Sequence, residues 1–330
     1  MKRVAATLAI AISTTPAYAD TLGPYTDLLV FGDSLSDPGN VFAFTDSLTP
    51  VEGDGTPPPP YFNGQFSNGD TWASILGADL ESGTNFAHGG ATARQTVQDP
   101  LDIPDFVDQR ALYDASSVDL GDNPLTAVWF GGNDLRVLLT PEGAGIDPGA
   151  LIGEVVTEIV AGIIDLSSTQ LDDFLVFGLP DFGAIPGVNQ DEGMSFMATQ
   201  LSTNFNTALS QTLSFVFGGS PTNVSFFDTQ GFFADLLEDS DTLGITNLTD
   251  ACLVPDDPKT DENEFFFCGA DQFSYAFFDG LHPTAPIHAA LAAELRSTLA
   301  PVPLPGSIAF ALGGLALLGG AARRRKVARA

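Results

Sequence analysis

Four short apolar segments constrain the fold of this chain most strongly. They occupy residues 28–31, 125–130, 174–177 and 224–227, and each ends abruptly at glycine or aspartate. Short apolar runs bounded in this way are typical of buried strands. Because the runs show no polar alternation, both faces of each strand must be covered, as in a parallel sheet.

Segments with helical periodicity separate these strands. In residues 148–168, Leu151, Val155, Ile159 and Ile163 fall on one helix face. Further helices are expected at residues 70–80, 194–217, 231–237 and 285–299, a short strand at 84–87, and irregular structure at 243–278. The pattern predicts an α/β fold of three layers, α/β/α, with a doubly wound, mainly parallel sheet. A single domain over residues 20–300 accounts for it.

Three polar or glycine positions follow the predicted strands directly. Ser34, Gly90 and Asn133 each come just after a strand end, and ligands of open parallel sheets bind beyond the carboxyl ends of the strands. If a helix begins after Ser34, its backbone N–H groups and dipole favour negative charge beside the hydroxyl. Ser34 is then a candidate nucleophile for acyl transfer, although a serine in this position could equally be a simple helix cap.

The chain has three histidines that could act as a base. His282 precedes Pro283, which disfavours helix and puts the imidazole on a turn. Asp279 lies three residues earlier and can hydrogen-bond one ring nitrogen, which leaves the other to take the Ser34 proton. We interpret His288 as a cap or surface residue, and His88 as lining the edge of the site without an assigned role.

These residues lie in four blocks that carry a family resemblance. The blocks are FGDSLSDPGN at 31–40, NFAHGGAT at 85–92, GGND at 131–134 and DGLHPT at 279–284. Their order and content resemble the GDSL lipases and esterases, also called SGNH hydrolases, which have a flavodoxin-like sheet. The resemblance implies that Ser34 is the nucleophile and that His282, oriented by Asp279, is the base. It also implies an oxyanion hole formed by Ser34, Gly90 and Asn133, with no cofactor or metal. Pro38 and His88 depart from the usual pattern.

The resemblance predicts a serine esterase or lipase that hydrolyses carboxylic esters through an acyl-enzyme on Ser34. A polysaccharide O-acetyl esterase and a lipid acyltransferase would use the same site, and a surface or matrix structural protein on this scaffold is the non-enzymatic alternative. Substrates would be lipids, small acyl esters or acetylated polysaccharides. The many phenylalanines between residues 226 and 278 would line an acyl site or fill the core.

The two ends of the chain differ from the middle. Residues 1–19 combine Lys2 and Arg3, a short apolar run and an Ala-Tyr-Ala sequence, which indicates a secretory signal peptide. Residues 301–330 combine a Val-Pro-Leu-Pro sequence, an uncharged stretch and a basic cluster. This order resembles C-terminal sorting signals of the PEP-CTERM class, in particular its VPLPA-CTERM variant, and a permanent membrane anchor is the alternative. We expect export to the periplasm, cell surface or medium, with sorting machinery as a partner.

The remaining body is strongly acidic. It holds five Lys and Arg against all 42 Asp and Glu, a difference of 37 negative charges. Such a surface repels phosphate backbones, so nucleic acid is an improbable partner. The acidic residues at 256–264 could bind calcium or form a solvated loop, and their spacing does not fit an EF-hand. Cys252 and Cys268 predict one disulfide, because an even cysteine count is typical of exported chains.

Overall fold

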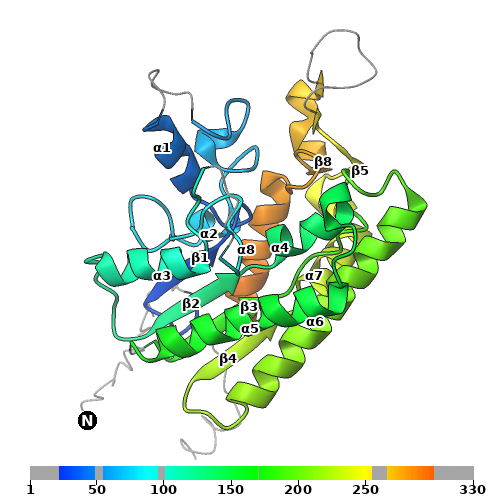
Figure 1. Ribbon diagram of the computed structural model, residues 1–330. Helices are drawn as coiled ribbons and strands as arrows, with labels where there is room; N and C mark the ends of the chain where they lie inside the picture. Colours follow the sequence, from blue (N-terminus) through cyan, green and yellow to red (C-terminus); the bar gives the residue numbers. More distant parts are fainter. Residues whose placement is uncertain (1–21, 49–54, 96–100, 170, 255–265, 301–330) are drawn as a thin grey trace, which may run out of the picture.

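A four-stranded parallel sheet forms the centre of the molecule (Figure 1). The computed structural model describes residues 22–48, 55–95, 101–169, 171–254 and 266–300. The strands lie in the order β1-β2-β3-β4. Their bounds are β1 Asp27–Gly32, β2 Pro124–Trp129, β3 Asp173–Phe177 and β4 Asn223–Phe227. All four predicted strands and the predicted fold class are therefore confirmed. The strand expected at 84–87 is reduced to a single parallel bridge between Asn85 and Val30.

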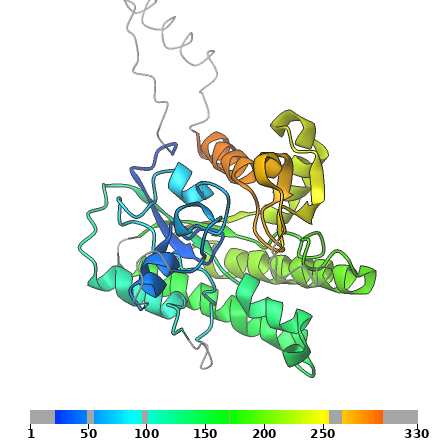
Figure 2. The ribbon, with the colours of Figure 1, turned by 90° about the horizontal axis from the view of Figure 1, so that it is seen from above.

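Helices cover both faces of the sheet, and Figure 2 shows the two helical layers from above. Leu29 and Phe31 of β1 face the side of α3 (Phe106–Ala115), α5 (Pro148–Ser167) and α6 (Glu192–Phe217). Leu28 and Val30 face α2 (Trp72–Ile75) and α8 (Ala285–Leu299). Successive side chains of a strand point to opposite faces, so an unbroken apolar run supplies two cores at once.

Four of the five predicted helices are confirmed, and the fifth ends early at a glycine with positive φ. The predicted helices at 148–168, 194–217, 231–237 and 285–299 correspond to α5, α6, α7 (Thr229–Glu238) and α8. The helix predicted at 70–80 is wrong beyond Ile75, because Gly77 takes a left-handed conformation with φ +93°. Two short helices were not predicted, α1 (Asn40–Asp46) and α4 (Gly132–Arg136).

The segment expected to be irregular carries several short strands. β5 (Asn247–Ala251) pairs in parallel with β8 (Tyr275–Phe277), and β6 (Leu253–Val254) pairs with β7 (Phe266–Phe267). The predicted disulfide joins Cys252 to Cys268 and is confirmed. Short 3₁₀ helices complete the fold at η1 Phe62–Gly64, η2 Val137–Leu139, η3 Pro141–Gly143, η4 Ser240–Leu243 and η5 Gly269–Ser274.

Three sequence predictions lie outside the described residues. They are the signal peptide at 1–19, the C-terminal segment at 301–330 and the acidic run at 256–264. Within the described part of the chain, no helix is long and apolar enough to cross a membrane. The same residues contain no group of three or more His, Cys, Asp or Glu side chains arranged to hold a metal ion.

Candidate active site

Ser34, His282 and Asp279 form a continuous hydrogen-bonded chain. Ser34 Oγ lies 2.8 Å from His282 Nε2, and His282 Nδ1 lies 2.7 Å from Asp279 Oδ2. An ionised carboxylate only accepts hydrogen bonds, so Nδ1 carries the ring proton and Nε2 is free to accept from the serine hydroxyl. Although 248 positions separate them, the serine and the histidine meet at the carboxyl edge of the sheet.

Asp279 is held by four donors. Its Oδ1 accepts the backbone N–H groups of Leu281 (2.8 Å) and His282 (2.7 Å). Its Oδ2 accepts the His282 ring and the Tyr61 hydroxyl, the latter at 2.5 Å. Burial acts to raise the pKa of Asp279, but the charge of His282 and the hydrogen bonds from His282 and Tyr61 lower it to about 2. Asp279 is thus a carboxylate at any pH at which the protein would work.

Ser34 lies on a tight turn rather than at the start of a helix. The backbone N–H groups of Ser36 and Asp37 both donate to Asp33 O, and α1 begins only at Asn40. The condition for a helix dipole to act directly on Ser34, a helix that begins after it, is therefore not met. The turn itself leaves the Ser34 N–H without a hydrogen-bond partner among the described residues, and this donor lies beside its own hydroxyl.

The Asp37 carboxylate links this turn to the loop that carries Gly90. Its Oδ1 accepts the N–H groups of Gly39 and Asn40, and its Oδ2 accepts Gly89 N–H at 2.7 Å. Burial raises the pKa of Asp37 to about 6, although its backbone hydrogen bonds act in the opposite direction. Gly90 follows with φ +88°, a conformation that favours glycine, and a Cβ there would meet nothing within 4 Å. Gly90 is exposed, but it does not line the cavity that holds Ser34.

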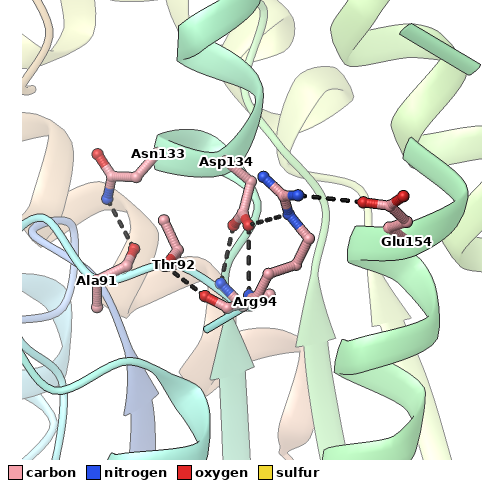
Figure 3. A network of polar contacts seen from close by, with 7 residues as sticks. Ala91, Thr92, Arg94, Asn133, Asp134 and Glu154 are labelled. Carbon is pink, nitrogen blue, oxygen red and sulfur yellow. Dashed lines mark hydrogen bonds and ion pairs between the residues drawn. The ribbon is translucent and has the colours of Figure 1, made fainter. Parts of the chain in front are cut away.

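Asn133 and Asp134 fix the far end of the same loop, as Figure 3 shows. The Asn133 amide donates to Ala91 O at 2.9 Å. Asp134 accepts the N–H groups of Ala93 (2.8 Å) and Arg94 (3.3 Å), and its carboxylate also pairs with the Arg94 guanidinium at 3.1 Å. Burial raises the pKa of Asp134, and these donors oppose the shift. The loop from Gly89 to Arg94 is thus tied to Asp37 at one end and to α4 at the other.

The two remaining histidines do not take part in the Ser34 contact. His88 is buried, and its Nδ1 lies 2.8 Å from Phe86 O, so the expectation that it lines the site edge is wrong for the cavity around Ser34. His288 is buried rather than on the surface, and its Nδ1 accepts Trp72 N–H, the first N–H of α2, at 3.3 Å. Burial, with the charge of His282, lowers the pKa of His288 to about 3. It serves as a neutral acceptor between two helices.

Asp33 is a buried carboxyl directly beside the nucleophile. Its Oδ1 accepts Leu35 N–H at 3.0 Å. Burial raises the pKa of Asp33 to about 7, and the Leu35 hydrogen bond and the charges of His282 and Arg136 oppose this shift. The group therefore changes charge near neutral pH, within the wall of the site.

The site opens into a cavity of about 440 Å³. Ser34, Asn133, Asp279 and His282 all lie in its wall. Most other wall residues are apolar: Leu35, Leu139, Leu179, Phe182, Ile185, Val188, Met194 and Leu281. An apolar cavity with a few convergent polar groups is typical of a small-molecule site, and here those groups include the Ser34 hydroxyl, the His282 imidazole and the Asn133 amide.

Sequence reasoning brought together Ser34, His282, Asp279 and Asn133, which share this cavity. It assigned no role to Tyr61, Asp37 and Arg94, which hold the site residues in position through the contacts above. Asp37 and Asp134 lie inside the blocks that carry the family resemblance, so their sequence positions could have indicated a role at the site. Tyr61 follows a run of prolines, and nothing in its local sequence points to Asp279.

Comparisons with known proteins agree with this geometry. The family model described as GDSL-like Lipase/Acylhydrolase matches residues 28–295. The secreted effector protein SseJ of Salmonella typhimurium is 27% identical over 85% of this chain and 65% of its own length. The phosphatidylcholine-sterol acyltransferase of Aeromonas hydrophila is 25% identical over 73% of this chain and 69% of its own. The chain thus spans about two thirds of the length of these relatives.

Among solved structures, an acetylxylan esterase variant from Geobacillus stearothermophilus is similar to this chain. The two share 14% sequence identity, with a TM-score of 0.42 over 85% of this chain and 96% of the esterase.

Proposed function

The chain belongs to the GDSL-like lipase/acylhydrolase family, and we propose that it hydrolyses carboxylic esters through an acyl-enzyme on Ser34. The observation that carries the proposal is the 2.8 Å contact between Ser34 Oγ and His282 Nε2, with Nδ1 held 2.7 Å from Asp279. A serine hydroxyl is a weak nucleophile, and an adjacent oriented base is what activates it.

In the proposed reaction His282 takes the Ser34 proton as Oγ attacks the ester carbonyl. The proton then passes to the leaving alcohol oxygen as the ester bond breaks, which leaves the acyl group on Ser34. In the second half the same imidazole takes a proton from water as the water oxygen attacks the acyl carbonyl, and it gives the proton to Ser34 Oγ as the acyl–Oγ bond breaks and the acid leaves. Asp279 keeps its negative charge throughout and stabilises the imidazolium, in line with its lowered pKa of about 2.

The oxyanion formed in each half would be received by three donors. We propose the N–H groups of Ser34 and Gly90 and the side-chain amide of Asn133. Removing one such donor costs roughly 3 kcal/mol of transition-state stabilisation. Support comes from the Ser34 N–H, which has no hydrogen-bond partner in the described part of the chain, the open space at Gly90 and the position of Asn133 in the cavity wall. The amide of Asn133 has two N–H bonds, so its donation to Ala91 O leaves one for substrate.

Acyl transfer to a second alcohol is the favoured alternative at this site. A relative that covers 73% of this chain is named for acyl transfer from phosphatidylcholine to a sterol. The acyl-enzyme would be the same, and the attacking group would be an alcohol in place of water. Product analysis with and without an added alcohol acceptor separates the two outcomes.

We also propose that the protein is exported, with residues 1–19 as a signal peptide and 301–330 as a sorting signal. Two relatives are named as a secreted effector and a hemolysin, which supports export. Mass spectrometry of the mature protein tests both ends: we expect a first residue near Asp20 and no peptide that contains Leu315. A secreted form that retains either segment would contradict this part of the proposal.

The central experiment is covalent labelling with an organofluorophosphonate, read by mass spectrometry. We expect the label on Ser34 and loss of ester hydrolysis by at least roughly a thousandfold in Ser34→Ala. The control is Ser36→Ala, because the Ser36 hydroxyl accepts the Trp72 indole N–H at 3.2 Å and makes no hydrogen bond to His282 or Asp279 among the described residues, and this variant should still be labelled. Ester hydrolysis that survives in Ser34→Ala would remove Ser34 from its role.

A further inference from the structure

A second apolar cavity adjoins the one that contains Ser34. It has a volume of about 270 Å³ and shares four wall residues with the first: Leu35, Phe182, Ile185 and Leu281. Two of these are chain neighbours of the proposed machinery, since Leu35 follows Ser34 and Leu281 precedes His282. The two cavities therefore adjoin at side chains that are next to the reacting groups in the chain.

The wall of the second cavity suits an apolar ligand. Phe233, Ala234 and Leu237 of α7 and Phe277 of β8 also line it. Its two polar side chains with hydrogen-bonding capacity are already engaged: Asp181 accepts from Gly183 N–H at 2.8 Å and Thr199 Oγ1 at 2.7 Å. Gln230 donates to Thr203 Oγ1 at 3.2 Å. A polar ligand would have little to bind there, whereas a hydrocarbon chain would be covered.

We propose that this second cavity receives the distal part of the substrate's acyl chain, so that the enzyme prefers long-chain acyl esters to acetyl esters. The inference rests on the proposed function of Ser34 and specifies its substrate. An acyl chain attached at Ser34 starts beside Leu35 and Leu281, and those side chains border the second cavity. The first cavity is then left to hold the ester group and the alcohol.

The size of the effect follows from burial. Each methylene moved from water to an apolar site is worth roughly a fourfold gain in binding. Eight methylenes separate a dodecanoyl chain from a butanoyl chain, so even partial burial predicts a large preference in kcat/KM. Chains that are too short to reach past Leu35 should gain nothing from the second cavity.

Ala234→Trp is the direct test, because Ala234 lies in the wall of the second cavity and is exposed on α7, where a large ring is tolerated. The substrates are the p-nitrophenyl esters of butanoate, octanoate and dodecanoate. We expect kcat/KM for dodecanoate to fall at least tenfold, and kcat/KM for butanoate to stay within twofold of the parent. Ala234→Leu, a smaller block, should give an intermediate loss. Asp235→Trp places the same ring at the next exposed position of α7, outside the cavity wall, and should change neither ester.

The outcomes separate the two proposals. If the parent enzyme cleaves butanoate but neither prefers dodecanoate nor responds to Ala234→Trp, the acyl-chain site is wrong and the function of Ser34 stands. If the parent cleaves none of the esters and Ser34 is not labelled, the proposed function falls and the acyl-chain site falls with it. Equal losses on all three esters in Ala234→Trp would also overturn the assignment, since they would indicate a general disturbance of the site.

Discussion

The Tyr61 hydroxyl donates to Asp279 Oδ2 at 2.5 Å, the same oxygen that faces His282 Nδ1. These two residues are 218 positions apart. The tyrosine therefore ties the loop before η1 to the turn that carries the proposed base. Burial raises the pKa of Tyr61 strongly, and the neighbouring charge of Asp279 adds to this shift, so the hydroxyl stays protonated and remains a donor.

Tyr61→Phe removes this donor without changing the ring. We expect kcat to fall about fivefold to twentyfold with KM unchanged, because a hydrogen bond to a charged group is worth roughly 1.5–3 kcal/mol and only part of that acts on the base. Tyr113→Phe, on α3, should leave kcat as it is. A rise in KM with unchanged kcat would instead mean that Tyr61 contacts substrate, since it also lines the cavity.

The contrast between Tyr61 and the strands shows what the sequence could predict. Residues 28–31 and 174–177 are apolar on both faces, and only a covered parallel strand satisfies that pattern. The contact between Tyr61 and Asp279 depends on the path of a loop, which no local periodicity encodes. The common edge of parallel strands predicted that Ser34 and Asn133 would lie close together. The meeting of Ser34 with His282 came from the family resemblance of their blocks, because His282 follows no strand of the central sheet.

The errors have equally local causes. Trp72, Ile75 and Leu76 have helical spacing, but Gly77 takes a left-handed conformation and ends α2 after one turn. For His288 the surface alternative is wrong and the cap alternative holds, because its buried Nδ1 accepts the first N–H of α2.

Asp37 should position the Gly89–Gly90 turn rather than contact substrate. In Asp37→Asn an amide NH₂ group, which cannot accept a hydrogen bond, replaces one carboxylate oxygen. The side chain then cannot accept the N–H groups of both Gly39 and Gly89, which lie at 2.8 and 2.7 Å in the parent. We expect kcat to fall about tenfold to a hundredfold while KM changes little, because the loss concerns a donor used only in the transition state. The check is steady-state kinetics on a short-chain ester. An unchanged kcat in a folded Asp37→Asn protein would show that Gly90 holds its position without this bond.

Asp33 should make the fold less stable as pH rises. Its pKa is raised to about 7 by burial, so the folded chain holds this proton more tightly than the unfolded chain does. The stabilisation is present below about pH 4 and is lost as the pH rises to about 7. In Asp33→Asn this loss should disappear, and the fall in unfolding free energy between pH 5 and 8 should be smaller by up to roughly 3 kcal/mol. Urea unfolding at both pH values measures it, with exposed Asp235→Asn as the control. If the unfolding free energy fell by the same amount between pH 5 and 8 in Asp33→Asn and in the parent, the prediction would be wrong.

The two ion pairs of Arg94 should contribute very different amounts to the free energy of unfolding. The pair with Asp134 joins a guanidinium that is 29% exposed to a carboxylate with no exposure, whereas Glu154 on the other side is 63% exposed (Figure 3). Arg94→Gln leaves the Asp134 charge buried with fewer donors, and we expect a loss of about 2–3 kcal/mol in unfolding free energy. Glu154→Gln should cost less than about 1 kcal/mol, because exposed pairs are screened by water.

Since Asp134 also holds the loop that Asn133 contacts, Arg94→Gln should lower kcat as well, while Glu154→Gln should not. Equal effects of the two substitutions would mean that the buried carboxylate is held by the backbone N–H groups of Ala93 and Arg94 alone.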